Sequence, residues 1–206
     1  MPRQCLKLAL SLALLVIATC GKDKYDRAAQ ALSELMDWQP GQMIAEIGAG
    51  EGQMSFSAAA AVGPSGHVYT TELDNDKLAH LRKEVARRGL TNVTVIKADT
   101  VSVNLPDACC DSIFMRRVYH HFGNPAATDL SILRALKPGG YLAVIDFPPK
   151  KSLPPVNGAP PAHGTGHGVR KELIEKELSS AGFEDIQEHE GSEFSSDYCI
   201  IAHKSR

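Results

Sequence analysis

Short apolar segments typical of buried strands alternate with amphipathic helical segments along most of this chain, and this alternation restricts its fold more than any other feature. Strands are predicted over residues 43–47, 67–73, 93–98, 111–116 and 141–147. Helices are predicted over residues 25–38, 53–62, 74–89 and 125–136. A repeating strand–helix order requires a parallel sheet with helices on both faces, which places the chain in the α/β class.

The C-terminal part of the chain follows a different pattern. A helix is predicted over residues 170–181, with Gly182 as its cap, and two strands are predicted over residues 185–189 and 198–203. Because these two strands follow each other without a helix between them, they can pair as an antiparallel hairpin across residues 190–197.

Residues 148–169 separate the two patterns and hold six of the 12 prolines of the chain. This composition excludes a helix or a central strand, and a connection of this length is usually a lid or binding loop, or else disordered. His163 and His167 lie four residues apart in it, but neighbouring glycines prevent the helix that would bring both imidazoles to one face. We therefore expect a solvated loop here and no metal site.

The first 20 residues differ from the rest of the chain. Arg3 and Lys7 precede an uncharged apolar run over residues 8–18, which is the layout of a secretory signal and is short for a bilayer span. Residues 17–20 also resemble a bacterial lipoprotein cleavage box, in which Cys20 would carry the lipid. We expect residues 1–20 to be a signal peptide or membrane anchor, residues 21–206 to be one domain, and the protein to be membrane-associated or exported.

The charge and the cysteine content exclude several further kinds of binding site. Lys and Arg number 22 against 24 Asp and Glu, so a net charge of -2 gives no basic excess and no nucleic-acid partner is expected. Outside the first 20 residues, the cysteines are Cys109, Cys110 and Cys199, with no zinc-binding spacing. A bridge between the adjacent pair would be strained, so these residues are interpreted as small buried or strand-edge thiols.

A glycine-rich motif, EIGAGEG at residues 46–52, follows the first strand and opens a helix. Glycines let the backbone turn tightly and approach a ligand at the helix N-terminus. Glu72 ends the second strand, where a carboxylate can accept hydrogen bonds from both ribose hydroxyls of a nucleoside. Asp99 ends the third strand and is suitably placed for an adenine amino group. Together these three strand ends predict a site for a nucleoside-containing ligand.

Six segments carry a family resemblance: AEIGAGEG at 45–52, TELD at 71–74, ADT at 98–100, DSIFMRRVYHHF at 111–122, LKPGG at 136–140 and SAGF at 180–183. Over roughly residues 30–206 the chain resembles the class I S-adenosylmethionine-dependent methyltransferases. The resemblance implies a Rossmann-like, doubly wound, seven-stranded sheet in the order 3-2-1-4-5-7-6, with strand 7 antiparallel.

The resemblance also implies S-adenosylmethionine as cofactor and assigns residues to it. Glu46 stands where members of the family carry Asp or Glu. The methionine part would pass Gly48, Gly50 and Gly52, the ribose would meet Glu72, and the adenine would meet Asp99 with Thr100. Arg116 stands at a position that commonly lines the pocket in the family.

Residues 119–122 (YHHF) follow the fourth strand, and we expect them to form the acceptor side of the site. The aromatic side chains of Tyr119 and Phe122 can line the pocket. If the acceptor needs a base, His120 or His121 can take its proton. His120 is slightly favoured because it is nearer to Arg116. The expected acceptor is an unidentified small molecule. Two alternatives stay open: a non-catalytic protein that binds a nucleoside or a partner at a membrane, and a nicotinamide-dependent oxidoreductase, which the Gln at position 53 disfavours.

Overall fold

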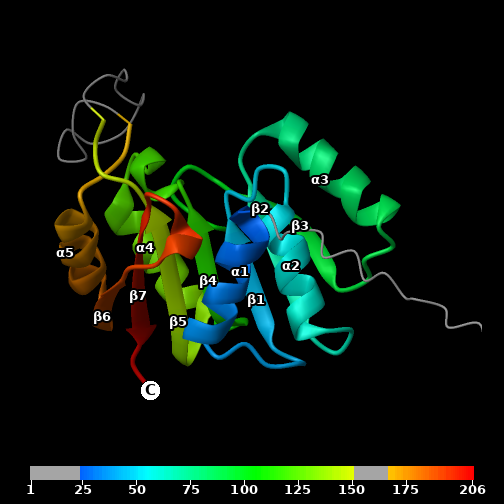
Figure 1. Cartoon of the computed structure of the whole chain (residues 1–206), viewed down its shortest axis with the longest axis horizontal. Helices are drawn as coiled ribbons and strands as arrows, with labels where there is room; N and C mark the ends of the chain where they lie inside the picture. The colour runs from blue at the N-terminus through cyan, green and yellow to red at the C-terminus, as the bar shows by residue number, and fades with distance from the viewer. Residues whose placement is uncertain (1–23, 151–166) are drawn as a thin grey trace, which may run out of the picture.

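The computed structural model describes residues 24–150 and 167–206 (Figure 1). In this part of the chain, seven strands form one sheet in the order β3-β2-β1-β4-β5-β7-β6. Neighbouring strands are parallel from β3 to β5, whereas β7 is antiparallel to both β5 and β6. The topology implied by the family resemblance and the predicted C-terminal hairpin are both confirmed.

The strands and helices have these bounds. The strands are β1 (Met43–Ile47), β2 (His67–Glu72), β3 (Val93–Lys97), β4 (Cys110–Arg116), β5 (Leu136–Asp146), β6 (Phe183–His189) and β7 (Tyr198–Lys204). The helices are α1 (Lys24–Leu35), α2 (Gln53–Val62), α3 (Asn75–Arg87), α4 (Pro125–Ala135) and α5 (Lys171–Ala181), with two 3₁₀ turns, η1 (Tyr119–His121) and η3 (Ser192–Phe194).

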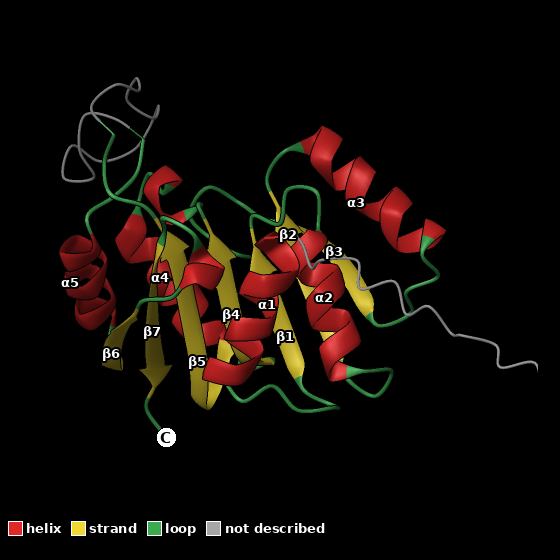
Figure 2. Cartoon of the chain, viewed as in Figure 1, coloured by secondary structure: helices red, strands yellow, loops and turns green. Residues whose placement is uncertain are grey.

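Apolar side chains of β1, β4, β5 and β7 lie on both faces of the sheet, as expected for strands buried on both sides. Ile113 and Met115 of β4 point toward the layer that contains α4 and α5, while Phe114 between them points toward α1 and α2. Figure 2 shows α1 and α2 in front of the strands. Because successive side chains of a strand alternate between faces, one strand joins two hydrophobic cores.

The start of β5 differs from the prediction, which ended a helix at residue 136 and began the strand at Tyr141. The strand begins at Leu136, which pairs with Cys110, and the register then shifts between Cys110 and Ser112. Gly139 adopts a φ of 75°, a left-handed conformation that suits glycine at an irregular position in a strand. The LKPGG segment is therefore an irregular strand entry.

The ends of the Pro/Gly-rich segment lie side by side at the end of β5. The Val169 N–H donates to the Phe147 carbonyl (3.0 Å), and the Lys150 N–H donates to the His167 carbonyl (2.9 Å). Residues 151–166, which include His163, and the predicted leader at residues 1–20 lie outside the described part of the chain. Within residues 24–150 and 167–206, no helix is long and apolar enough to span a membrane.

Candidate active site

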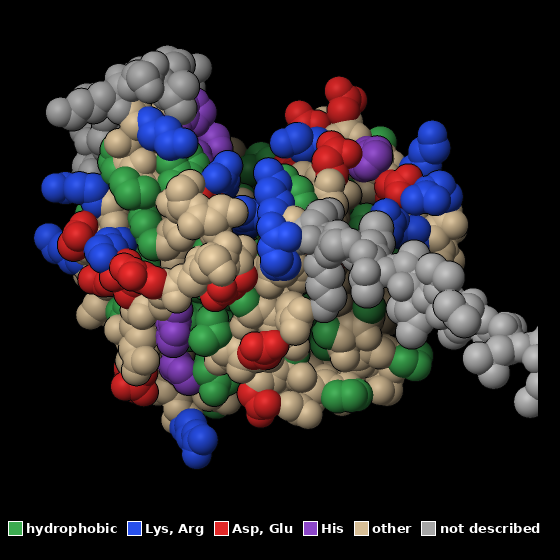
Figure 3. Space-filling view, viewed as in Figure 1, with side chains coloured by type: hydrophobic (Ala, Val, Ile, Leu, Met, Phe, Trp, Pro, Cys, Tyr) green, Lys and Arg blue, Asp and Glu red, His purple; other side chains and the backbone are tan. Residues whose placement is uncertain are grey.

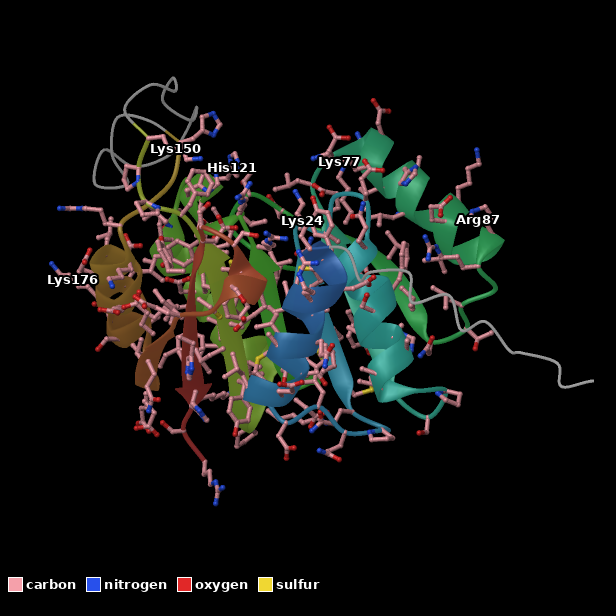
Figure 4. The ribbon with its side chains drawn as sticks, viewed as in Figure 1. Lys24, Lys77, Arg87, His121, Lys150 and Lys176 are labelled. Carbon is pink, nitrogen blue, oxygen red and sulfur yellow. The ribbon has the colours of Figure 1, made fainter. Side chains whose placement is uncertain are left out.

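Two connected hollows lie at the carboxyl ends of β1, β2 and β4. The larger has a volume of about 520 Å³ and the smaller about 260 Å³, and both are bordered by Gly48, Lys77, Arg116 and Arg117. Figure 3 shows the surface hollowed at this edge, and in Figure 4 Lys24, Lys77 and His121 lie along it. The larger hollow is also lined by Glu72, Asp99, Thr100, His121 and Phe122, and the smaller by Lys24, Tyr25, Glu46 and Gly50. Open α/β sheets bind ligands at this edge.

The glycine loop between β1 and α2 uses each of its glycines differently. Gly48 has a φ of 65°, and a Cβ there would lie 2.5 Å from a Val118 methyl group, so the side chain of a larger residue has no room. A Cβ on Gly50 would meet nothing within 4 Å, which leaves open space beside the loop. Gly52 caps α2 and packs against Leu81 and Phe56, and it is not among the described residues that line either hollow. Its expected contact with the methionine part stays a prediction.

Glu72 joins the end of β2 to the glycine loop. Its Oε2 accepts a hydrogen bond from the Gly50 N–H (3.0 Å), and its Oε1 accepts from the N–H groups of Leu73 (2.7 Å) and Asp74 (3.2 Å). These bonds fix the orientation of a carboxylate that is only 7% exposed. Since each carboxylate oxygen has two lone pairs, Oε2 keeps capacity for a ligand hydroxyl.

Glu46 is the penultimate residue of β1, and its buried side chain lines the smaller hollow. The Ser55 hydroxyl donates to its carboxylate, and the Thr70 hydroxyl donates to Ser55 (2.8 Å). Burial is the main cause that raises the pKa of Glu46 to about 8, against the opposing effect of the Ser55 hydrogen bond. The carboxyl group therefore holds its proton at neutral pH and serves as a neutral hydrogen-bonding group.

Arg116 ends β4 between the two hollows, as predicted. Its side chain is 6% exposed and its Nη2 donates to Asp197 (3.4 Å), while Nε and Nη1 are buried without a hydrogen-bond partner in the described part of the chain. Arg117 makes a bidentate pair with the same carboxylate (2.8 and 2.9 Å). Two unpartnered guanidinium nitrogens at the edge of a cavity can receive the oxygens of an anionic ligand group.

Asp99 and Thr100 follow β3 and line the larger hollow. Asp99 accepts hydrogen bonds from the backbone N–H and the hydroxyl of Thr100, so the loop holds this carboxylate in place. Both side chains are exposed, and they line the same hollow as Arg116 and His121. The structure thus brings the three predicted strand ends around one cavity.

The two histidines of η1 occupy different environments. His120 is buried and its Nδ1 contacts the Asp146 carboxylate at 2.9 and 3.1 Å, whereas His121 lines the larger hollow. Burial, followed by the neighbouring His120 ring, lowers the pKa of His121 to about 4. The catalytic roles assigned to His120, His121 and Arg116 stay predictions.

Two interpretations of side chains near η1 are wrong. Tyr119 does not wall the pocket: its ring is fully buried in the core, and its hydroxyl donates to Asp129 (2.8 Å). His167 is not a solvated loop residue, because it is half-buried and forms a cluster with His120 and His121. Asp146, which contacts His120, and Asp197, which pairs with both arginines, were not identified from the sequence. Neither residue lies in a recognisable motif.

Cys109 and Cys110 are free thiols at the start of β4, half-buried and buried, as interpreted from the sequence, and Cys199 is also free and buried. The pKa of the Cys110 thiol is raised, first by its hydrogen bond with the Cys109 thiol and then by burial. None of the three lines either hollow of the site.

Comparisons with known proteins identify the family of the domain. Residues 39–189 match the model of a family described as a methyltransferase domain. The chain is 30% identical over 115 residues to the ubiquinone/menaquinone biosynthesis C-methyltransferase of Ectopseudomonas mendocina, a match covering 55% of this chain and 45% of that protein. The chain thus spans about half the length of the curated relatives that it matches.

Solved structures share the fold. A SAM-dependent methyltransferase from Aquifex aeolicus superposes with a TM-score of 0.68 at 23% identity, covering 85% of this chain and 87% of that one. Phosphoethanolamine N-methyltransferase 2 of Haemonchus contortus, in complex with S-adenosyl-L-methionine, superposes with a TM-score of 0.70 at 17% identity, covering 88% and 53% of the two chains.

The sheet order defines an α/β domain with the Rossmann-like fold of methyltransferases. The chain belongs to the methyltransferase domain family, whose model covers residues 39–189. The family implies S-adenosylmethionine as the cofactor, and the residues present fit this group: a buried carboxylate at Glu72 with acceptor capacity left, open space beside Gly50 and unpartnered guanidinium nitrogens on Arg116.

Proposed function

We propose that the chain transfers a methyl group from S-adenosylmethionine to a small-molecule acceptor. The observation that carries this proposal is that Gly48, Glu72 and Asp99, from three successive strand ends, line one cavity that Arg116 also borders. A cavity of about 520 Å³ is of the size that holds a nucleoside-sized ligand with a small second molecule.

Each part of the donor has a matching group in this proposal. Glu72 accepts hydrogen bonds from the ribose hydroxyls, and Asp99 with Thr100 meets the adenine. The methionine part lies over the glycine loop in the smaller hollow, where Lys24 and Arg116 supply positive charge for its carboxylate. When bound, S-adenosylmethionine would supply an electrophilic methyl group, whose carbon–sulfur bond breaks as the acceptor bonds to the methyl carbon and S-adenosylhomocysteine leaves.

The contribution of the protein to this reaction is alignment. Holding donor and acceptor in contact converts an encounter of two molecules into a step within one complex, which supplies much of the rate enhancement. The acceptor side is bordered by Val118, His121 and Phe122, which come from the segment after β4. This largely apolar wall with one imidazole supports a small organic acceptor, and its identity follows from the loops rather than from the fold.

The proposal is tested by turnover. The full chain is incubated with S-adenosylmethionine and fractionated small-molecule extracts, and S-adenosylhomocysteine is measured by mass spectrometry. We expect its formation to depend on one extract fraction and to fall at least tenfold in Asp99→Ala. Donor binding without turnover in any fraction would instead support a non-catalytic nucleoside-binding protein.

We further propose that residues 1–20 direct the protein to a membrane or out of the cytosol. The support is the sequence alone: two basic residues, an uncharged apolar run over residues 8–18, and Cys20 in a lipoprotein-like context. We expect the full chain to partition with membranes and a chain starting at Lys22 to stay in the soluble fraction. Recovery of the uncleaved full chain entirely in the soluble fraction would contradict this targeting role.

A further inference from the structure

Three histidine side chains meet beside the candidate active site, although they come from two distant segments. His120 and His121 belong to η1 after β4, and His167 precedes α5. One nitrogen from each ring lies within 4.8 Å of the others. The ring centroids of His120 and His121 are 4.1 Å apart, and His167 meets them at 5.8 and 6.0 Å.

His120 is held in the orientation that a metal ligand requires. Its Nδ1 contacts the buried Asp146 carboxylate (2.9 Å), and because a carboxylate only accepts, Nδ1 donates there and Nε2 is the ring nitrogen left for a metal ion. Asp146 is fixed in turn by the N–H groups of His120 (3.2 Å) and Phe147 (2.9 Å). Metal-bound histidines commonly donate their second ring N–H to a carboxylate in this way.

His167 is brought to this place by the backbone. The Lys150 N–H donates to the His167 carbonyl (2.9 Å), and the next residues continue the contact, with Val169 bonded to Phe147 (3.0 Å). The segment after the Pro/Gly-rich region is thereby pinned to the end of β5, the same strand end that carries Asp146. His167 and the carboxylate partner of His120 are thus positioned by one local structure.

We propose that His120, His121 and His167 bind one divalent transition-metal ion of the zinc type. Three imidazoles select Zn²⁺ and its neighbours rather than Mg²⁺ or Ca²⁺, which prefer oxygen ligands. Zinc–nitrogen bonds of about 2.0 Å place tetrahedral ligand atoms roughly 3.4 Å apart, so the ligand atoms must draw closer than 4.8 Å, and His121 is the most exposed of the three side chains. Sites with three protein ligands keep a fourth position for water or another ligand.

The location of this site adds to the proposal. His121 belongs both to the histidine cluster and to the lining of the larger hollow, so the ion would sit at the border of that hollow. The buried negative charge of Asp146 also favours a cation nearby. Metal binding is measured without the methyl donor, so its failure leaves the proposed methyl transfer untouched.

The test is a titration of the metal-stripped full chain with Co²⁺, a zinc substitute whose visible absorption reports its ligands. We expect one equivalent to bind with the ligand-field bands of a four- or five-coordinate ion, and Zn²⁺ to displace it. Affinity should fall at least tenfold in His167→Ala and in His121→Ala. Asp146→Asn should weaken it by about 10- to 100-fold through the orientation of His120.

His80→Ala is the matched control, because His80 is a partly exposed histidine of α3 that pairs with Glu51 and lies outside the cluster. It should bind Co²⁺ as the wild type does. The proposal is overturned if the wild type binds no stoichiometric ion, if His167→Ala and His121→Ala both retain wild-type affinity, or if intense thiolate-to-metal absorption shows that cysteines hold the ion.

Discussion

At the scale of single residues, Glu72 is the proposed contact for the ribose and also holds the glycine loop through a hydrogen bond from Gly50. Replacing Glu72 with Ala removes the acceptor for the ribose hydroxyls, and a charge-assisted hydrogen bond is worth about 1.5–3 kcal/mol. The dissociation constant for S-adenosylmethionine should therefore rise at least about tenfold, measured by calorimetric titration.

The structure adds a second consequence to this change, which the sequence did not reveal. Because Gly50, Leu73 and Asp74 all donate their N–H groups to Glu72, the variant should also lose about 1–3 kcal/mol of unfolding free energy. Glu84→Ala on α3 is a suitable control and should keep wild-type donor affinity. Wild-type affinity in a folded Glu72→Ala protein would exclude the ribose assignment.

Glu46 gives a prediction on pH dependence. Burial raises the pKa of its carboxyl group from 4.5 in the unfolded chain to about 8 in the fold, so folding takes up a proton between these values. The stability contributed by the neutral carboxyl is complete below about pH 4.5 and is lost as the pH rises through about 8. Glu46→Gln removes this titration, while its amide keeps a similar volume and an acceptor for Ser55.

The free energy of unfolding of the wild type should therefore fall relative to Glu46→Gln by a few kcal/mol from about pH 5 to pH 8. Urea unfolding at several pH values measures this difference, because the other titrating groups cancel between the two proteins. Parallel curves for the two proteins would show that Glu46 does not titrate with a raised pKa.

At the scale of secondary-structure elements, Tyr119 ties η1 to α4 and α5. Its hydroxyl contacts Asp129 of α4 (2.8 Å) and Glu177 of α5 (3.0 Å). Burial is the main cause that raises the pKa of Asp129 to about 7. Tyr119→Phe leaves these buried groups without the hydroxyl, so the unfolding free energy should fall by about 1–3 kcal/mol in denaturant unfolding.

Tyr141→Phe serves as the control, since Tyr141 is a half-buried tyrosine of β5 whose ring packs on His203. Its stability should stay within about 0.5 kcal/mol of the wild type. Equal stabilities of the two variants would mean that the Tyr119 hydroxyl does not link the elements.

Element ends marked by local chemistry were predictable from the sequence. Asp74 caps α3 by accepting from the N–H groups of Asp76 and Lys77, and Gly182 ends α5 with a φ of 101°. The entry of β5 was not predictable, because Leu136 joins the strand through its pairing with Cys110, a contact between distant residues. Local signals such as Pro and two glycines favour a turn at that place.

At the scale of the whole molecule, the alternating pattern predicts the class of fold but not the order of the strands. That order came from the resemblance, since parallel strands pair with partners that lie far apart in the sequence. The residues of the site divide in the same way, into those that local patterns predict and those that distant contacts bring together. Glu72 and Asp99 end predictable strands, whereas His167 reaches η1 only because the backbone beyond residue 166 is bonded to the end of β5.

The measurement that tests the central claim most directly is calorimetric titration of the full chain with S-adenosylmethionine, with a nicotinamide dinucleotide as the competing ligand. We predict binding of one donor molecule per chain, competition by S-adenosylhomocysteine, and no binding of the dinucleotide at the same concentrations. Absence of donor binding, or displacement of the donor by the nicotinamide dinucleotide, would contradict a methyl-donor site at the ends of β1, β2 and β4.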